Sequence, residues 1–420
     1  MTVRAFSGGA GCGKTYRLMQ ALSDHLEQTP LKAGQKVLAL TFMHGSRRRL
    51  HERLSSIPAL AYKHECATVD SFAWRIVRRW QALLIQLGLG IPAVGNYDQV
   101  CDAAATALQQ DIVVRWVAAT FPIVLLDEAQ DLTPVRLRIV RALATRLEVV
   151  AAADEFQCLD EQLRPNPACT WLAEVGNIEN LAVPKRTTVP ALLQAASAIR
   201  SGVAPVSNGL FRIDLTPKPQ LAGSWVANAL GWYGGNKRVA VITPATGQFS
   251  EKVIEWVGAN TTKQGHGPFN IRWERSESQA AADFLAQLHL PDIGTLTEID
   301  AAVRLCGDLH VTHHVAKWLN LQRRTQGRSD FAREEIEAIV QESFSNRRRR
   351  QRDTDGRFRA MTVHGAKNRE FDNVIVLWPA AVGGSDDQKR RLLYNAVTRA
   401  RSRCLVLVQA KAALTQAPFV

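Results

Sequence analysis

The segment from Gly8 to Thr15, GGAGCGKT, has the residue types and spacing needed to hold the phosphates of a nucleotide. It fits the pattern G-x-x-x-x-G-K-[ST], in which the backbone N–H groups of a glycine-rich turn surround phosphate oxygens. Lys14 would reach the β- and γ-phosphates, and Thr15 would bind a magnesium ion. An extended run before the segment and a helical pattern after it place the turn where a strand passes into a helix. The sequence therefore predicts a phosphate-binding loop, whose glycines are Gly8, Gly9, Gly11 and Gly13.

Two adjacent carboxylates, Asp127 and Glu128, follow the apolar run 123–126. A buried parallel strand would deliver them to the carboxyl edge of a sheet, where ligands bind. A lone pair of acids is more often a solvated strand end, but downstream of a phosphate loop it completes a nucleotide hydrolysis site. Asp127 would hold magnesium together with Thr15, and Glu128 would orient or deprotonate the attacking water. The predicted ligands are ATP and Mg²⁺.

The composition indicates a globular protein that binds a polyanion. The chain has 420 residues, 46% of them hydrophobic, and a formal net charge of +13. A chain of this length can form two or three domains, and such a positive charge favours nucleic acid as a partner. The seven cysteines are scattered and form no C-x-x-C pair, so they predict neither a disulfide framework nor a zinc site. With no signal peptide or long apolar run, we expect a cytoplasmic or nucleoid-associated protein and no membrane partner.

The elements that position these residues follow an α/β pattern. Short apolar runs at 36–42, 123–126 and 147–152 alternate with helical patterns, which indicates a parallel sheet. A second set of strands is predicted at 238–243, 360–363, 374–378 and 404–408, without a phosphate loop of its own. We expect one domain over residues 1–182 with a short insertion at about 75–120. The second, over residues 183–420, would carry a small helical insertion at about 265–359.

Six further segments along the chain carry candidate motifs. They are ALTFMHGSRRR (39–49), ATVDSFAWRI (67–76), ADEFQ (153–157), PKRTT (184–188), TVHGAKNREF (362–371) and RRLLYNAVTRAR (390–401). With the phosphate loop and the acid pair, they resemble the ordered motifs of superfamily 1 helicases of the UvrD/Rep/PcrA group, in a compact form with small accessory insertions. The last segment carries most weight, because Y-x-A-x-T-R-A before an apolar strand is long and specific.

On the nucleotide side, the resemblance implies that Gln157 senses the γ-phosphate and that Arg186 and Arg399 reach it from the second domain. Arg399 would neutralise charge in the transition state, as arginine fingers do in related hydrolases. Glu370 would reach the ribose. The group usually stacks a tyrosine on adenine where this chain has Lys185, and Tyr16, next to Thr15, is our candidate replacement.

On the nucleic-acid side, an aromatic side chain beside basic residues is the platform that single-strand binding needs. Phe42 would stack on a base, although taken alone it would be a core residue beside solvated arginines. Asp70 stands where the group has histidine, and we leave it out because an acid near a phosphate is unfavourable. The DNA contacts that the resemblance implies are Thr41, Phe42, His44, Ser71, His364 and Lys367.

We thus expect two RecA-like parallel-sheet domains of the P-loop NTPase type, with ATP between them and single-stranded DNA, or a junction of single and double strands, lying across both. The resemblance implies an ATP hydrolase and DNA helicase that moves 3′ to 5′. The alternative is a nucleic-acid-stimulated ATPase that switches or remodels a partner without processive unwinding, and a protein partner in a repair, replication or defence complex fits either activity. A non-catalytic module with a decayed ATPase is disfavoured by the intact phosphate and magnesium residues.

Overall fold

The structure is a computed structural model that describes residues 3–42, 44–90, 92, 96–175, 177–233, 235, 237–274, 277–347 and 357–420. Within these ranges, the side chains of residues 44–46, 48, 277–279, 326 and 345–347 are not described. None of the helices in the described ranges is long and apolar enough to cross a membrane.

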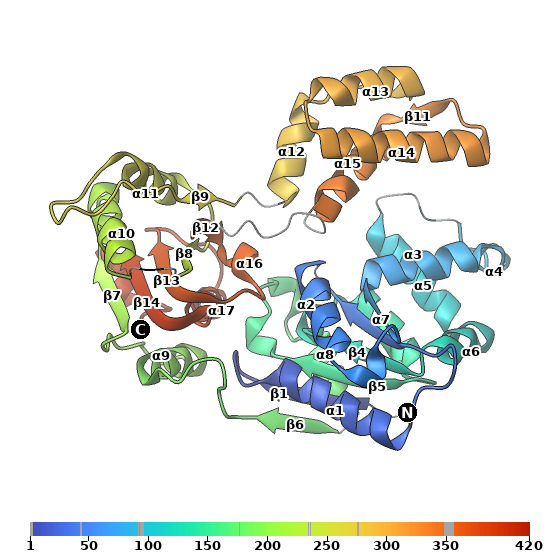
Figure 1. The fold of residues 1–420 in the computed structure, drawn as a ribbon, viewed down its shortest axis with the longest axis horizontal. Coiled ribbons are helices and arrows are strands. Elements are labelled where there is room, and N and C mark those ends of the chain that lie inside the picture. Colours follow the sequence, from blue (N-terminus) through green and yellow to red (C-terminus); the bar gives the residue numbers. More distant parts are fainter. Residues whose placement is uncertain are drawn as a thin grey trace.

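The N-terminal part of the chain forms a parallel six-stranded sheet (Figure 1). In spatial order its strands are β3 (His64–Thr68), β2 (Val37–Thr41), β4 (Ile123–Leu126), β5 (Glu148–Ala153), β1 (Val3–Gly8) and β6 (Ile178–Leu181). Its helices are α1 (Lys14–Gln28), α2 (His44–Ser55), α3 (Val69–Arg79), α4 (Gln81–Gln86), α5 (Tyr97–Leu108), α6 (Asp111–Thr120), α7 (Pro134–Leu143) and α8 (Pro167–Glu174). Helices α1 and α2 cover one face, and the others pack on the opposite face.

A second parallel six-stranded sheet follows. Its order is β7 (Phe211–Leu215), β14 (Ala400–Val408), β13 (Phe371–Trp378), β8 (Val239–Thr243), β12 (Phe358–Thr362) and β9 (Arg272–Trp273). Helices α9 (Pro190–Ser201), α16 (Val363–Ala366) and α17 (Asp386–Val397) pack on one face, and α10 (Pro219–Tyr233) and α11 (Gln248–Ala259) on the other. The predicted fold class, two parallel-sheet α/β units, is confirmed.

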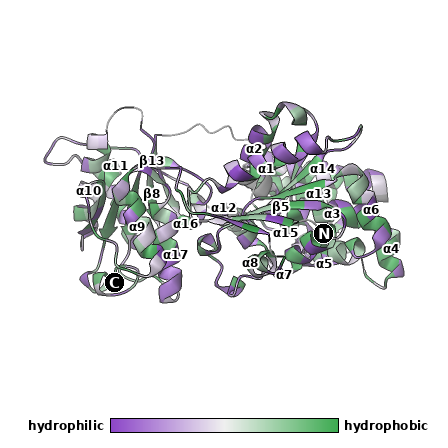
Figure 2. Cartoon of the chain, turned by 90° about the horizontal axis from the view of Figure 1, so that it is seen from below, coloured by the Kyte–Doolittle hydropathy of each residue, from purple (hydrophilic) through white to green (hydrophobic). Residues whose placement is uncertain are grey.

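Both sheets are buried on two sides because the side chains of a strand alternate between its faces. In β4, Val124 and Leu126 enter one core, whereas Ile123 and Leu125 enter the core on the opposite face. Such strands are apolar throughout, so in Figure 2 they are largely green, while hydrophilic purple collects on outer helices such as α2. The burial explains why continuous apolar runs predicted these strands correctly.

A small helical unit stands apart from the two sheets (Figure 1). It comprises α12 (Glu277–Gln287), β10 (Ile293–Thr295), α13 (Leu296–Leu305), α14 (Leu309–Gln326), β11 (Asp330–Ala332) and α15 (Arg333–Arg347), and it has a core of its own. Strand β9 precedes this unit and pairs with β12, so the second sheet continues past residue 265, where the insertion was expected to begin.

Candidate functional site

The turn between β1 and α1 has a backbone that needs its glycines. Gly11 has φ +79° and Gly13 has φ +80°, a left-handed conformation that strains other residues. A side chain at Gly8 would place its Cβ only 2.5 Å from the carbonyl oxygen of Leu181. The loop therefore keeps its path, with the N-terminus of α1 directed into it, because these positions lack side chains.

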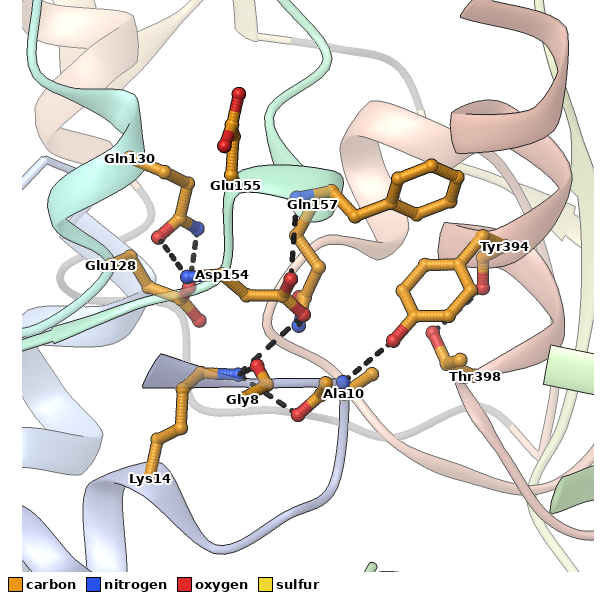
Figure 3. Close-up of polar contacts among 12 residues, drawn as sticks. Gly8, Ala10, Lys14, Glu128, Gln130, Asp154, Glu155, Gln157, Tyr394 and Thr398 are labelled. Atoms are coloured by element: carbon orange, nitrogen blue, oxygen red, sulfur yellow. Dashed lines mark hydrogen bonds and ion pairs between the residues drawn. The ribbon is translucent and has the colours of Figure 1, made fainter. Parts of the chain in front are cut away.

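Lys14 lies folded back into this loop. Its Nζ donates to the carbonyl oxygens of Gly8 and Gly9 at 2.9 and 3.0 Å and lies 3.7 Å from Asp154 Oδ2 (Figure 3). Because Lys14 is buried, its ammonium has lost its hydrating water, and these oxygens replace it. The ammonium is thus positioned at the mouth of the loop by backbone and one acid.

The predicted magnesium ligands lie together. Thr15 Oγ1 is 3.4 Å from Asp127 Oδ2, so the first turn of α1 lies beside the carboxyl end of β4. Hydroxyl and carboxylate oxygens are the hard ligands that Mg²⁺ takes alongside water and phosphate. The two residues fit the ion.

The electrostatics of the acid pair also favour a cation. Burial, together with the neighbouring charge of Glu128, raises the pKa of Asp127 to about 6. Burial acts against ionised Glu128 as well, but Lys14, Lys367 and a 2.7 Å hydrogen bond from Gln130 Nε2 lower the pKa of this carboxyl. Glu128 is therefore ionised and oriented, while Asp127 carries an electrostatic cost that a bound cation would relieve.

Asp154 connects the loop to the second sheet. Its backbone N–H donates to Gln130 Oε1 at 2.9 Å, and its carboxylate accepts from Gln157 Nε2 at 2.8 Å and from Arg200 Nη1 at 2.8 Å. The carboxylate itself is fully buried, so these donors satisfy it. Arg200 lies on α9 and was not predicted, because no local motif surrounds it.

Arg399 is a buried cation between α17 and β14. We call the first sheet with its helices the first wall of the site, and the second sheet with its helices the second wall. Arg399 Nη2 donates to Gln157 Oε1 at 3.2 Å and its Nε to the carbonyl oxygen of Asn395 at 2.9 Å. Within the described part of the chain, no carboxylate lies within 4.0 Å of its guanidinium. Burial, with Arg186 nearby, lowers the pKa of Arg399 to about 10. A buried guanidinium in this state is stabilised by an anion.

Arg186 approaches the loop from the connection between the sheets. Its backbone N–H donates to the carbonyl oxygen of Gly11 at 3.2 Å, and its Nη1 donates to the carbonyl oxygen of Thr398 at 2.9 Å. Its Nε forms a 2.8 Å ion pair with Glu370, which also binds Arg401. Glu370, the predicted ribose contact, thus holds Arg186 in this structure.

Tyr394 on α17 reaches the loop directly. Its hydroxyl accepts from Ala10 N at 2.8 Å and from Arg200 Nη1 at 3.2 Å (Figure 3). The side chain is buried. The Tyr394 hydroxyl therefore accepts the hydrogen bond of a loop N–H. In loops of this type, such N–H groups donate to phosphate.

The candidate base contacts also touch each other. Lys185 Nζ lies 4.8 Å from the centroid of the Tyr16 ring, which is 61% exposed. Lys185 N also donates to Gly11 O at 2.6 Å. The cation rests on the aromatic side chain that was expected to stack on adenine.

The first nucleic-acid candidates lie at the carboxyl ends of two neighbouring strands. Thr41 pairs in register with Thr68, so Phe42 and the start of α3 lie on the same sheet edge. Thr41 is buried, whereas Phe42 is 40% exposed. Ser71 is exposed, and its N–H donates at 3.2 Å to the Thr68 hydroxyl that caps α3.

The aspartate that departs from the family pattern has a structural partner. Asp70 Oδ1 accepts from Arg136 Nε at 2.8 Å, and Asp98 binds the same guanidinium at 2.8 Å. The Arg136 guanidinium carbon lies 5.7 Å from the centroid of the Phe42 ring. Asp70 therefore supports the cation beneath Phe42, an arrangement that the sequence did not reveal.

The second group of nucleic-acid candidates is divided. His364 is exposed at α16, whereas the partly buried Lys367 forms an ion pair with Asp131 of the first unit. His364 belongs to the second unit, whereas Phe42 and Ser71 belong to the first. The side chain of His44 lies outside the described residues, although its backbone begins α2.

Family models match a part of each unit. A family model described as an AAA domain matches residues 1–161, and a model of the UvrD-like helicase C-terminal domain matches residues 357–407. No curated protein matches the chain. Among solved structures, the arterivirus nonstructural protein 10 helicase is similar at 11% identity and a TM-score of 0.38, over 96% of this chain.

The chain spans 59% of the length of that viral chain, and a likeness this distant adds nothing to the assignment. The two family models match the unit with the phosphate loop and the unit with Arg399, in the order that the motifs predicted. The two matches together support a UvrD/Rep-like superfamily 1 helicase.

Proposed function

We propose that this protein hydrolyses ATP between its two sheets and uses the reaction to move 3′ to 5′ along single-stranded DNA. The observation that carries the proposal is that the two sides of the site favour ligands of opposite charge. Asp127 on the first wall favours a cation, and Arg399 on the second favours an anion. Magnesium with a nucleoside triphosphate supplies both charges at once.

The nucleotide roles follow from position. Lys14 and the loop N–H groups bind the β- and γ-phosphates, and Thr15 and Asp127 would hold Mg²⁺, which neutralises phosphate charge when bound. Glu128, ionised and fixed by Gln130, orients the attacking water. The residues that act on the γ-phosphate from the far side are Gln157, Arg186 and Arg399.

Domain movement follows from the bonds that phosphate would replace. Tyr394 holds the N–H of Ala10, and the carbonyls of Gly8 and Gly9 hold Lys14. ATP phosphates compete for the N–H and the ammonium. Of these contacts, the Tyr394–Ala10 bond joins residues 1–182 to residues 183–420, which we assign as the two domains, so ATP binding releases a contact between them. Hydrolysis restores these contacts, and alternation between the two arrangements changes the grip on DNA.

Nucleic acid contacts the same interface. We assign stacking to Phe42 and backbone contacts to Thr41, Ser71 and His364. Lys367 is held by Asp131 across the interface, so a DNA phosphate that draws it away would separate the same two units. DNA binding and ATP binding are thereby coupled.

The test is magnesium-dependent ATP hydrolysis with and without a single-stranded oligonucleotide. We expect the oligonucleotide to stimulate turnover and Lys14→Ala to abolish it, because the phosphates lose their buried cation. Lys32→Ala, which removes an exposed lysine far from the loop, is the matched control and should retain activity. Turnover by Lys14→Ala at the wild-type rate would contradict the proposal.

A further inference from the structure

Three side chains outside the nucleotide site converge between α2 and β3. His64 and Cys66 are two residues apart on β3, so they point to the same side of the strand. His51 comes from α2, whose Leu50 and Leu54 belong to the core that Cys66 borders. One ligand atom from each of His51, His64 and Cys66 lies within 4.8 Å of the others.

Hydrogen bonds fix the orientation of the central ring. His64 Nδ1 lies 3.0 Å from the carbonyl oxygen of Leu60, which can only accept, so Nδ1 carries a hydrogen. In the neutral ring, Nε2 then has the lone pair, and it points at His51 Nδ1 at 2.9 Å. An imidazole oriented by a backbone carbonyl, with its free nitrogen directed at other donors, is the arrangement found in metal-bound histidines.

The donor set selects the class of ion. Two imidazole nitrogens and one thiolate suit Zn²⁺, which tolerates a fourth ligand from water. Nitrogens bound at about 2.0–2.1 Å in a tetrahedron lie roughly 3.4 Å apart. The 2.9 Å separation of the two ring nitrogens must therefore open slightly, and exposed His51 is free to make that movement.

We propose that His51, His64 and Cys66 form a zinc site that joins α2 to the edge strand β3. The thiol releases its proton to solvent when the ion binds. Burial raises the pKa of Cys66 to about 11, the positive charge of Arg47 acts in the opposite direction, and the neighbouring Glu65 is paired with Arg75. Ser55 Oγ, 3.5 Å from His64 Nε2, stands beside the position of the fourth ligand.

The site would act on the nucleic-acid contacts through its elements. Helix α2 begins just after Phe42, and β3 leads directly into the cap of α3 that carries Ser71. An ion between α2 and β3 fixes these two segments relative to each other. Zinc binding would therefore make the edge of the first sheet that carries the proposed DNA contacts more rigid.

The experiment titrates Co²⁺, as a spectroscopic probe, and then Zn²⁺ into the full-length chain under a phosphine reductant. We expect one ion per chain, with the charge-transfer absorption of a cobalt–thiolate bond and tetrahedral d–d bands that Zn²⁺ abolishes. Cys66→Ser should remove the charge-transfer band and weaken binding more than about 100-fold, since even an outer-shell change costs 10–100-fold. Cys306→Ser alters another free cysteine, in the helical unit, and should leave the spectrum unchanged.

His51→Ala is the second variant, because His51 is exposed and its removal spares the core. It should weaken binding while the melting temperature in EDTA stays at the wild-type value. Zn²⁺ should raise the melting temperature of the wild type but not of either site variant. Octahedral cobalt spectra, or a charge-transfer band that survives Cys66→Ser, would overturn the proposal and leave the two histidines as a helix–strand hydrogen bond.

Discussion

Replacement of Arg399 by glutamine should greatly lower the rate of ATP hydrolysis without lowering the stability of the fold. The lowering of its pKa from 12.5 to about 10 corresponds to roughly 3 kcal/mol of unfavourable charging free energy at neutral pH. For a base with a lowered folded-state pKa, this cost is fully present below about pH 10 and is lost progressively as the pH rises from about 10 towards the unfolded-state value of 12.5. Arg399→Gln removes the cost.

The substitution also removes three hydrogen bonds, to Gln157, Asn395 and Thr398, each worth about 1 kcal/mol. The two effects nearly cancel, so the free energy of unfolding of the nucleotide-free protein should stay within about 1 kcal/mol of the wild-type value. Loss of the arginine finger should lower DNA-stimulated kcat by about 10³–10⁵, or roughly 4–7 kcal/mol of transition-state stabilisation.

The assay pairs denaturant unfolding in EDTA with oligonucleotide-stimulated turnover. Arg391→Gln is the control. Arg391, on α17, is buried like Arg399, but its guanidinium is paired with Asp387 at 2.7 Å. The control variant should lose stability and keep most of its turnover. If Arg399→Gln instead lost more than about 2 kcal/mol of stability and retained near wild-type turnover, Arg399 would be a structural cation and our assignment would be wrong.

Four further outcomes are expected. Glu128→Gln should retain ATP binding but hydrolyse it far more slowly, which nucleotide-binding and single-turnover measurements distinguish from loss of binding. Asp70→Ala should weaken oligonucleotide binding by up to about 1–3 kcal/mol despite removing an acid, because the cation that supports Phe42 loses a partner; tighter binding would refute that role. GTP should support DNA-stimulated kcat/KM within about tenfold of ATP, since Lys185 replaces the tyrosine that stacks on adenine in related helicases and its ammonium covers Tyr16; a hundredfold preference for ATP would contradict this. The monomer should unwind long duplexes poorly, because its accessory regions are short, and efficient single-turnover unwinding would disprove the point.

The sequence predicted the central strands but missed strands at the borders of the sheets. Runs such as IVLL in β4 are apolar throughout because both faces are covered. The unpredicted strands β3, β6, β7 and β9 are the outermost strands of their sheets. Their sequences, HECAT, IENL, FRIDL and RW, include polar residues because one side meets solvent, so no continuous apolar run marks them.

The site was predictable where its residues share a motif and unpredictable where they meet only in the fold. Arg200 bonds to Asp154 and Tyr394, which lie 46 and 194 positions away, so no local pattern identifies it. Arg136 and Asp70 are 66 positions apart. Such pairs depend on how the helices pack, which spacing along the chain does not encode.

One departure from the family pattern has a local explanation. Asn368 stands where the related helicases have glycine, and it adopts φ +61°. Asparagine tolerates this left-handed conformation better than most residues do. The turn that leads into Glu370 therefore survives the substitution, and the motif remains recognisable.

The central claim is that hydrolysis between the two sheets moves the protein along a single strand, and stopped-flow translocation on end-labelled oligonucleotides of graded length tests it most directly. With ATP and Mg²⁺, we predict that the time to reach a fluorophore at the 5′ end increases linearly with oligonucleotide length, whereas a 3′-end label reports only dissociation. Signals that do not depend on length, together with ATP consumption that does not depend on length, would contradict the claim and indicate a nucleic-acid-gated ATPase that remodels a partner.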